Sequence, residues 1–273
     1  MAKRPPRLLI AAVAFVAGLV LVALLAPWIA PYDPTAQSII ARLQRPGASH
    51  WLGTDQFGRD LLSRVIYGLR ASLVISVLAV GVALLAGGTL GLVAAWFRGW
   101  TDRIVMRCMD VLFAFPVMLL AIGIIAMSGP GPTPASIAIA VVYTPIFARM
   151  LRGPALVIAE SDYVMNARSI GASDTRIIFL HILPNLTSVV LVQTSLLISS
   201  AILVEASLSF LGLGTQPPAP SLGTMLSDGR NFLLLSPWSA IFPGLAILIL
   251  AFALNFLGDV LRDTLDPRLR GDR

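Results

Sequence analysis

The sequence predicts an all-α, polytopic membrane protein with six transmembrane helices, and three observations carry that prediction. Hydrophobic residues make up 57% of the 273 residues and charged residues only 12%, with a mean hydropathy of +0.85. Soluble domains carry about 25% charged residues, so this chain has roughly half the usual supply for a surface in water. Long uncharged runs recur along the chain, and basic residues collect at their ends. Lipid is therefore the expected solvent for most of the apolar surface.

Six runs contain no Asp, Glu, Lys or Arg, and these candidate spans are 8–30, 71–97, 111–128, 133–148, 182–204 and 231–258. A helix needs about 20 mostly apolar residues to cross a hydrocarbon core of about 30 Å. Four of the runs meet this requirement by themselves. The third and fourth are short, and we expect them to include flanking residues such as Met109 and Met150.

The first run is also compatible with a secretory signal, because Lys3, Arg4 and Arg7 precede its apolar part. It is, however, longer than the apolar part of a signal peptide, which has about 7–15 residues, and no clear Ala-x-Ala cleavage site follows it. We therefore expect a membrane helix that the protein retains.

The connection between the first and second spans contains the start of a helix. Thr54 or Asp55 is suited to cap this helix, because a short polar side chain accepts a hydrogen bond from a free backbone N–H group. Arg59 and Asp60 follow beside an apolar face, and this amphipathic pattern predicts that both point to water.

The connection between the fourth and fifth spans predicts two short helices hinged at Gly171. Ser161 or Asp162 is placed to cap the first helix, and Ser173 or Asp174 the second. Glycine suits the left-handed conformation that commonly closes a helix. After the second helix, the chain is expected to enter the fifth span with a proline in its first turn.

This connection presents a candidate contact surface. Ala167, Gly171 and Ala172 are small and allow close approach at the bend, while Ile177 and His181 lie near one face of the second helix. An amphipathic segment lying on the membrane is the alternative interpretation.

Two polar residues of the fifth run are candidates for a role inside the membrane. Glu205 follows the end of the predicted span, and an ionisable residue there is a functional candidate by default. A place at the aqueous interface is the alternative. Gln193 lies deeper, where hydrogen bonding between helices is the commoner role.

Two shorter patterns predict packing contacts. The small residues from Gly87 to Gly91 predict a close helix–helix contact. Asp110 lies close to Arg107 near the end of a span, and we expect the two to form a paired interface charge.

The distribution of basic residues predicts that both termini are cytoplasmic. Of the 20 Lys and Arg residues, 14 fall on the side of the termini and 6 on the other side. The chain then forms one membrane domain. Residues 1–70 hold the first span and an exterior segment, and residues 71–273 form a core with the cytoplasmic loop at 151–181.

Several classes of function are disfavoured by the sequence. The formal charge of +6 is not arranged as a basic stripe interleaved with aromatics, so we expect no nucleic-acid partner. The single cysteine, Cys108, excludes an internal disulfide framework and a cysteine metal site. His50 and His181 are predicted on opposite sides of the membrane, which excludes a shared metal site. The absence of the G-x-x-x-x-G-K-[ST] phosphate cradle indicates that the chain does not supply the usual ATP-hydrolysing site.

The 151–181 loop resembles the cytoplasmic signature of ABC-importer permeases. In that signature Glu-Ala-Ala is followed by three residues and Gly, then by nine residues and an apolar-x-Leu-Pro ending. Ala167, Gly171, Leu183 and Pro184 keep this register, and His181 is typical of the peptide/nickel permease group. The resemblance covers nearly the whole chain, and its further matches are at 51–60, 206–214, 216–218, 258–263 and 266–267.

The resemblance implies an ABC importer permease fold and an inner-membrane, multi-pass location. It also implies a second, homologous permease, two ABC ATPases that carry ATP and Mg, and an extracytoplasmic substrate-binding protein, with lipid around the chain and no cofactor bound by it. The loop would dock an ATPase through Asp162, Ala167, Arg168, Gly171, Ala172, Ser173 and Ile177.

The same resemblance makes Asp55, Arg59 and Asp60 candidates to contact the binding protein. Gln193 and Glu205 are candidates for the translocation pathway because of their polar side chains in or next to the fifth span, and not because of the resemblance.

One departure concerns the signature's first two residues. Met165 and Asn166 stand where the family has Glu and Ala, so the ion pair of that Glu with the ATPase cannot form. Asp162 and Glu160 are the nearest acids, but neither occupies the same place on the helix.

The implied function is the transmembrane subunit of an ATP-driven importer of di- or oligopeptides. Nickel complexes and glutathione are alternative substrates within the same group. An ion-coupled secondary transporter is an alternative of another class, but such proteins carry polar clusters near the bilayer midplane, whereas these spans are free of charge. An embedded enzyme is disfavoured, because the sequence predicts no catalytic set on one side of the membrane.

Overall fold

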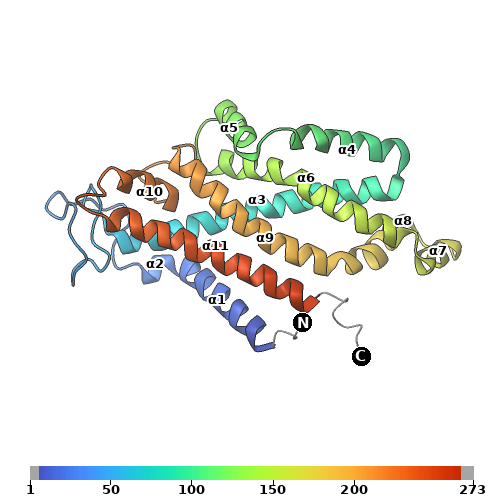
Figure 1. Cartoon of the computed structure of the whole chain (residues 1–273), viewed down its shortest axis with the longest axis horizontal. Helices are drawn as coiled ribbons and strands as arrows, with labels where there is room; N and C mark the ends of the chain where they lie inside the picture. The colour runs from blue at the N-terminus through green and yellow to red at the C-terminus, as the bar shows by residue number, and fades with distance from the viewer. Residues whose placement is uncertain (1–5, 266–273) are drawn as a thin grey trace.

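The computed structural model describes residues 6–265, and this part of the chain is built from helices and loops (Figure 1). The helices are α1 (Pro6–Leu24), α2 (Ala26–Ile29), α3 (Leu61–Phe97), α4 (Gly99–Phe113), α5 (Val117–Ser128), α6 (Pro132–Ala159), α7 (Asp162–Ser169), α8 (Asp174–Ile177), the π-helical turn η1 (Ile178–Ile182), α9 (Leu183–Phe210), α10 (Leu222–Arg230) and α11 (Trp238–Leu265). Within residues 6–265 the only isolated β-bridge joins Thr54 and Asp60. The predicted all-α class is confirmed.

Five helices are long and apolar enough to cross a membrane, namely α1, α3, α6, α9 with its preceding turns, and α11. The third predicted span, residues 111–128, is not one straight helix. It is divided between α4 and α5, which meet at an angle of 91°. The break lies before Pro116, since proline disfavours helical geometry in the preceding residue. The count is therefore five spans, or six if the bent pair is a single broken span.

Several predicted spans have other bounds in the structure, and the first run, 8–30, is divided between α1 and α2. α6 continues past residue 148 to Ala159, because its charged side chains find partners on α4. α9 continues past residue 204 to Phe210, so Glu205 lies inside the helix and not beyond its end. α11 begins only at Trp238, whereas its run was predicted from residue 231.

Some terminal features predicted from the sequence lie outside the described residues. They are the basic residues Lys3, Arg4, Arg268, Arg270 and Arg273, and the pair at 266–267.

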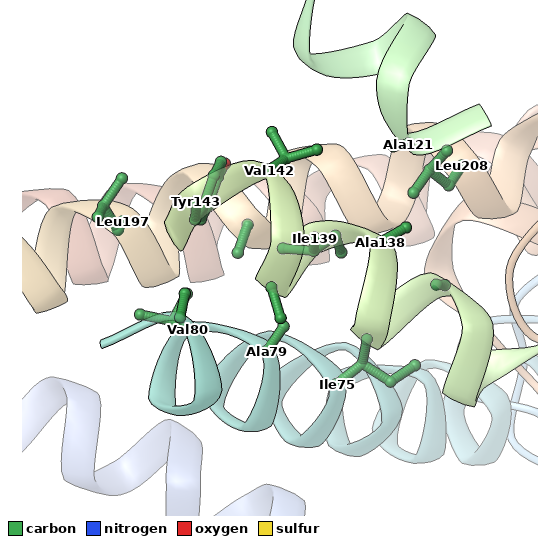
Figure 2. Close-up of a cluster of buried hydrophobic side chains, with 14 of the residues drawn as sticks. Ile75, Ala79, Val80, Ala121, Ala138, Ile139, Val142, Tyr143, Leu197 and Leu208 are labelled. Carbon is green, nitrogen blue, oxygen red and sulfur yellow. The ribbon is translucent and has the colours of Figure 1, made fainter. Parts of the chain in front are cut away.

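α3 and α6 form the central contact of the bundle. A side-chain methyl at Gly87 would lie 2.2 Å from the carbonyl oxygen of Thr144, and one at Gly91 would lie 2.3 Å from that of Ala148. Both helices therefore approach until backbone touches backbone, and the contact predicted for this glycine pair is confirmed. The largest buried cluster, which includes Ile75 of α3 and Ile139 of α6, fills the space beside it (Figure 2).

Two groups of segments lie at opposite ends of the bundle. At one end lie the segment 30–60, α10 and the start of α11; at the other lie α7 and α8 (Figure 1). α3 begins at Leu61 in the first group and crosses the division predicted at residue 70 without a break.

Candidate functional site

The loop at the α7–α8 end has the helix–glycine–helix form predicted from the sequence. Ser161 and Ser173 occupy the N-cap positions of α7 and α8, and the Ser173 hydroxyl accepts a hydrogen bond from the Arg176 N–H at 3.4 Å. Gly171 separates the helices with φ of +86°, in the left-handed region that favours glycine. The hinge at Gly171 is therefore confirmed.

The second helix differs from its prediction. α8 is not a separate helix followed by a span, because helical structure continues from Asp174 to Phe210. The π-helical turn Ile178–Ile182 lies between α8 and α9, and Pro184 follows in the first turn of α9. α8 is therefore part of a helical run of 37 residues, which is as long as α3.

The loop residues divide into an anchored set and an exposed set. Ile177 is 0% exposed and lies in a buried cluster with Val164, against which Ala167 and Ala172 also pack. Ile177 thus fixes the loop to the bundle and has no surface to offer a partner. The exposed residues between Asp162 and Arg176 are Asp162, Tyr163, Met165, Asn166, Arg168, Ser169, Ile170, Gly171, Ser173, Asp174, Thr175 and Arg176.

One exposed apolar side chain stands out on this loop. Ile170 is 86% exposed at the turn before Gly171. A methyl group built at Gly171 meets no atom within 4 Å, so the space beside this turn is open. The turn is therefore the most accessible apolar point of the loop.

Two acids lie near Met165, which stands where the family signature has Glu, and their surroundings differ. The Glu160 carboxylate lies 2.9 Å from a guanidinium nitrogen of Arg98 and is engaged within the chain. Asp162 is exposed in the first turn of α7, and no ion pair is found for it within residues 6–265. Asp162 and Asp174 are therefore the exposed acids of this loop that have no ion pair within residues 6–265.

Ion pairs hold the surrounding helices beside the loop. Asp102 of α4 accepts two hydrogen bonds from Arg152 of α6, at 2.5 and 2.6 Å. Asp110 accepts one from Arg149 at 2.6 Å, so the predicted pairing of Asp110 with Arg107 is wrong. Arg149 is the partner because α6 remains helical alongside α4, which the sequence did not indicate.

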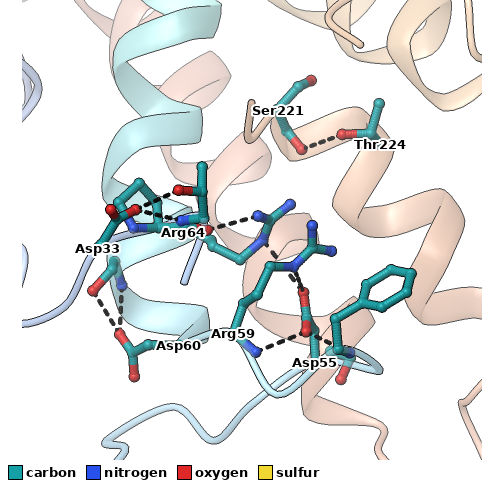
Figure 3. A network of polar contacts seen from close by, with 12 residues as sticks. Asp33, Asp55, Arg59, Asp60, Arg64, Ser221 and Thr224 are labelled. Carbon is teal, nitrogen blue, oxygen red and sulfur yellow. Dashed lines mark hydrogen bonds and ion pairs between the residues drawn. The ribbon is translucent and has the colours of Figure 1, made fainter. Parts of the chain in front are cut away.

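Asp55, Arg59 and Asp60 of segment 30–60 are structural, and the prediction that Arg59 and Asp60 point to water is wrong. All three are at most 4% exposed. Asp55 accepts hydrogen bonds from the Arg59 Nε at 2.6 Å and from the backbone N–H groups of Phe57 and Arg59 (Figure 3). Arg64 lies 3.5 Å from the same carboxylate. Because these side chains are buried and bonded within the chain, they present no surface to a binding protein.

Asp60, rather than Thr54 or Asp55, caps the helix that follows. Its Oδ2 accepts from the backbone N–H of Ser63 at 2.8 Å and from the Ser63 hydroxyl at 2.7 Å, while Oδ1 lies 2.9 Å from His50 Nδ1. One carboxylate thus joins the start of α3 to segment 30–60.

Near the beginning of segment 30–60, hydrogen bonds from the hydroxyl and backbone N–H of Thr35 lower the pKa of Asp33.

Glu205 lies in a buried polar cluster at the same end of the bundle. Its side chain is 0% exposed. It accepts hydrogen bonds from the hydroxyls of Ser72 at 2.6 Å, Ser209 at 2.7 Å and Ser221 at 3.4 Å. Within this chain Glu205 faces other helices and not an open channel. Gln193 is half-buried on α9, away from this cluster.

Sequence reasoning missed the residues that complete these sites. Ser72 and Ser221 are ordinary serines in the sequence, and only the fold brings them to Glu205 from 133 and 16 residues away. The Arg168 guanidinium lies 4.5 Å from the centre of the Trp96 ring, a contact without any local sequence signal. Among residues 6–265, no three His, Cys, Asp or Glu side chains form a group suited to a metal ion.

Comparison with known families gives two matches. The family described as the binding-protein-dependent transport system inner membrane component matches residues 87–271. The family described as the N-terminal TM domain of oligopeptide transport permease C matches residues 7–46.

Similar proteins cover almost the whole chain. A putative peptide transport system permease protein of Brucella suis is 49% identical, over 92% of this chain and 84% of the relative. A glutathione transport system permease protein of Pectobacterium atrosepticum is 46% identical, over 96% and 87%. A dipeptide transport system permease protein of Alkalihalophilus pseudofirmus is 43% identical, over 97% and 87%.

Similar solved structures agree on the fold. A chain of the MetNI methionine ABC transporter, solved in inward-facing conformations, superposes with a TM-score of 0.63 at 17% identity, over 76% of this chain and 98% of that chain. A chain from an amino acid ABC transporter solved with histidines superposes with a TM-score of 0.57, over 75% and 95%.

Proposed function

Because the chain belongs to the binding-protein-dependent transport system inner membrane components, the membrane subunits of ABC importers, we propose that it carries di- and oligopeptides across the inner membrane. The observation that supports peptides is the set of relatives 43–49% identical over more than nine-tenths of the chain, which are named for dipeptide, peptide and glutathione transport. Glutathione is the second candidate substrate, since a relative of 46% identity carries that name.

The proposed assembly pairs this chain with a second, homologous permease, two ABC ATPases and an extracytoplasmic binding protein. Within this assembly the chain takes part in transport and not in catalysis, so ATP and Mg bind to the ATPases. Both termini lie in the cytoplasm, which places α7 and α8 on the ATPase side and segment 30–60 outside. The supporting observation for this orientation is the excess of basic residues on the side of the termini.

The proposed coupling element is the turn at Ile170 and Gly171. Ile170 is exposed and apolar, the space beside Gly171 is open, and Asp162 supplies an available charge one helix away. Closure of the ATPase pair would push on this turn, and the continuous helix from Asp174 would carry the movement toward the exterior end. The ATPase shifts the permease between states only by binding one state better than the other.

Docking is tested by disulfide or maleimide crosslinking in the assembled transporter. A single cysteine at Ile170, in a Cys108→Ser background, is expected to crosslink to a cysteine on the ATPase surface. A cysteine at Ile40, which is 94% exposed at the opposite end, is the control and should give no crosslink. Failure at Ile170 in an assembled, ATP-hydrolysing complex would remove this turn as the docking point.

Substrate is tested with the complex and its binding protein in vesicles supplied with internal ATP. Accumulation of a labelled dipeptide and a pentapeptide is expected to exceed that of glutathione and of a nickel complex. Uptake of glutathione alone or of nickel alone would replace the peptide assignment. Uptake that ignores ATP and collapses with the ion gradient would contradict the ABC mechanism itself.

A further inference from the structure

Glu205 is a buried carboxylate that the proposed coupling does not use. Within residues 6–265 its partners are three serine hydroxyls, and no ion pair involves it. A buried carboxylate is costly unless donors surround it, so these three bonds are a condition for the observed packing. Their arrangement shows which helices the carboxylate joins.

The three bonds differ in the elements that they connect. Ser209 lies one turn further along α9, so its bond moves with Glu205. Ser72 belongs to α3, and Ser221 is the N-cap residue of α10. Two of the three bonds therefore cross from α9 to other elements, and one does not.

The N-terminus of α10 is seated closely against both neighbours. A methyl group at Gly223 would lie 2.1 Å from the Ala206 carbonyl oxygen on α9. A methyl group at Gly68 of α3 would lie 3.0 Å from the Leu222 side chain. The Ser221 hydroxyl makes no capping bond to α10 and reaches Glu205 instead. The partial positive charge at the start of α10 favours a carboxylate at this place.

We propose that Glu205 is a latch that holds α3 and α10 to α9 and keeps the exterior end closed. The latch opens when Ser72 and Ser221 leave the carboxylate and water replaces them, while Ser209 remains bonded. This inference rests on the proposed function, because a transport cycle requires the exterior end to open.

The test measures whether α10 is exposed in the assembled transporter, in vesicles with the exterior side outward. The reporter is a cysteine at Met225, a residue of α10 that is 4% exposed, in a Cys108→Ser background. Labelling by a membrane-impermeant maleimide is expected to be slow without ATP and faster with it. Loss of a hydrogen bond to a charged group shifts an equilibrium about tenfold, so Ser72→Ala should raise ATP-free labelling about tenfold.

Ser209→Ala is the matched control, because it removes the bond that does not cross between elements. It should leave ATP-free labelling within about twofold of the parent. Glu205→Gln keeps the side-chain size and replaces one of the two acceptor oxygens by an NH2 group that cannot accept a hydrogen bond, and it should raise labelling as Ser72→Ala does. A second reporter cysteine at the buried Val164, at the other end of the bundle, is labelled in permeabilised vesicles without ATP, and it should not respond to any of these changes.

Three outcomes would overturn the latch. They are parent-like labelling in both Ser72→Ala and Glu205→Gln, an equal rise in Ser209→Ala, or a parallel rise at the Val164 reporter, which would indicate general loosening. The comparison without ATP needs no substrate and no hydrolysis. Absence of any ATP effect in the parent would instead count against the proposed function and leave the latch comparison intact.

Discussion

At the scale of single residues, glycine is required at three positions of this chain for two different physical reasons. Gly87 and Gly91 are needed for space, since a methyl group at either position would enter the backbone of α6. Gly171 is needed for its backbone conformation, since φ is +86° and no atom lies near the position of a methyl group. A substitution at Gly91 should therefore lower the stability of the helix packing, whereas one at Gly171 should strain the backbone of the turn.

Gly91→Ala should destabilise the α3–α6 contact by about 1–3 kcal/mol, because overpacking forces the helices apart. The measurement is the melting temperature of the purified protein in detergent. Gly81→Ala in the same helix is the control, since nothing lies within 4 Å of a methyl group there. An unchanged melting temperature for Gly91→Ala would contradict the observed contact.

Gly171→Ala should cost about 1–2 kcal/mol of backbone strain at the turn, without any steric clash. Asparagine tolerates the left-handed conformation better, so Gly171→Asn should recover much of the loss. Because the strain is local, the overall melting temperature should change little, while copurification with the ATPase and ATP-driven uptake should fall in Gly171→Ala. Equal loss in both variants would indicate that the turn requires the absence of a side chain.

At the scale of elements, α4 is held on α6 by charge pairs of unequal strength. The Asp102–Arg152 pair is bidentate and partly buried, whereas Arg98–Glu160 is largely exposed. Bidentate charge-assisted bonds are stronger than single ones, and exposed pairs contribute little. The first pair should therefore fix α4, and the second should not.

A double-mutant cycle separates the two pairs. Asp102→Asn with Arg152→Gln should show a coupling energy near 1 kcal/mol or above, and Arg98→Gln with Glu160→Gln one of roughly 0–0.5 kcal/mol. Unfolding of the detergent-solubilised protein supplies the free energies. The first coupling should weaken less in high salt, since partly buried pairs are screened less. Equal couplings would show that burial does not distinguish these pairs.

At the scale of the whole molecule, the two ends of the bundle are built differently. The end that holds segment 30–60 is fixed by a buried network around Asp55 and Asp60, while the other end presents an exposed turn next to Gly171. The first end is therefore held by side-chain bonds, and the second has a solvent-exposed loop.

The orientation of the whole molecule gives a direct prediction. In intact cells, an impermeant maleimide should label a cysteine at Ile40 and leave a cysteine at Ile170 unlabelled, in the Cys108→Ser background. Permeabilised cells should show labelling at both positions, since both side chains are highly exposed. The reverse pattern would invert the proposed topology.

The sequence by itself determined the membrane class, the family resemblance and the hinge at Gly171, because these depend on composition and on local backbone preference. It also indicated the glycine contact of α3, since small residues spaced along a helix have few other uses. It misplaced the third span, because hydropathy counts apolar residues and does not register a 91° bend.

Only the tertiary structure decided which polar groups are partners. Arg59 and Asp60 appear exposed by their spacing, yet the fold closes the exterior segment over them. Glu205 accepts hydrogen bonds from Ser72 and Ser221, which are distant in the sequence and belong to no recognisable motif. Local periodicity specifies which face of a helix is polar, whereas the partner of a buried charge depends on long-range packing. For that reason the Gly171 hinge was predicted from the sequence, whereas the partners of Glu205 were not.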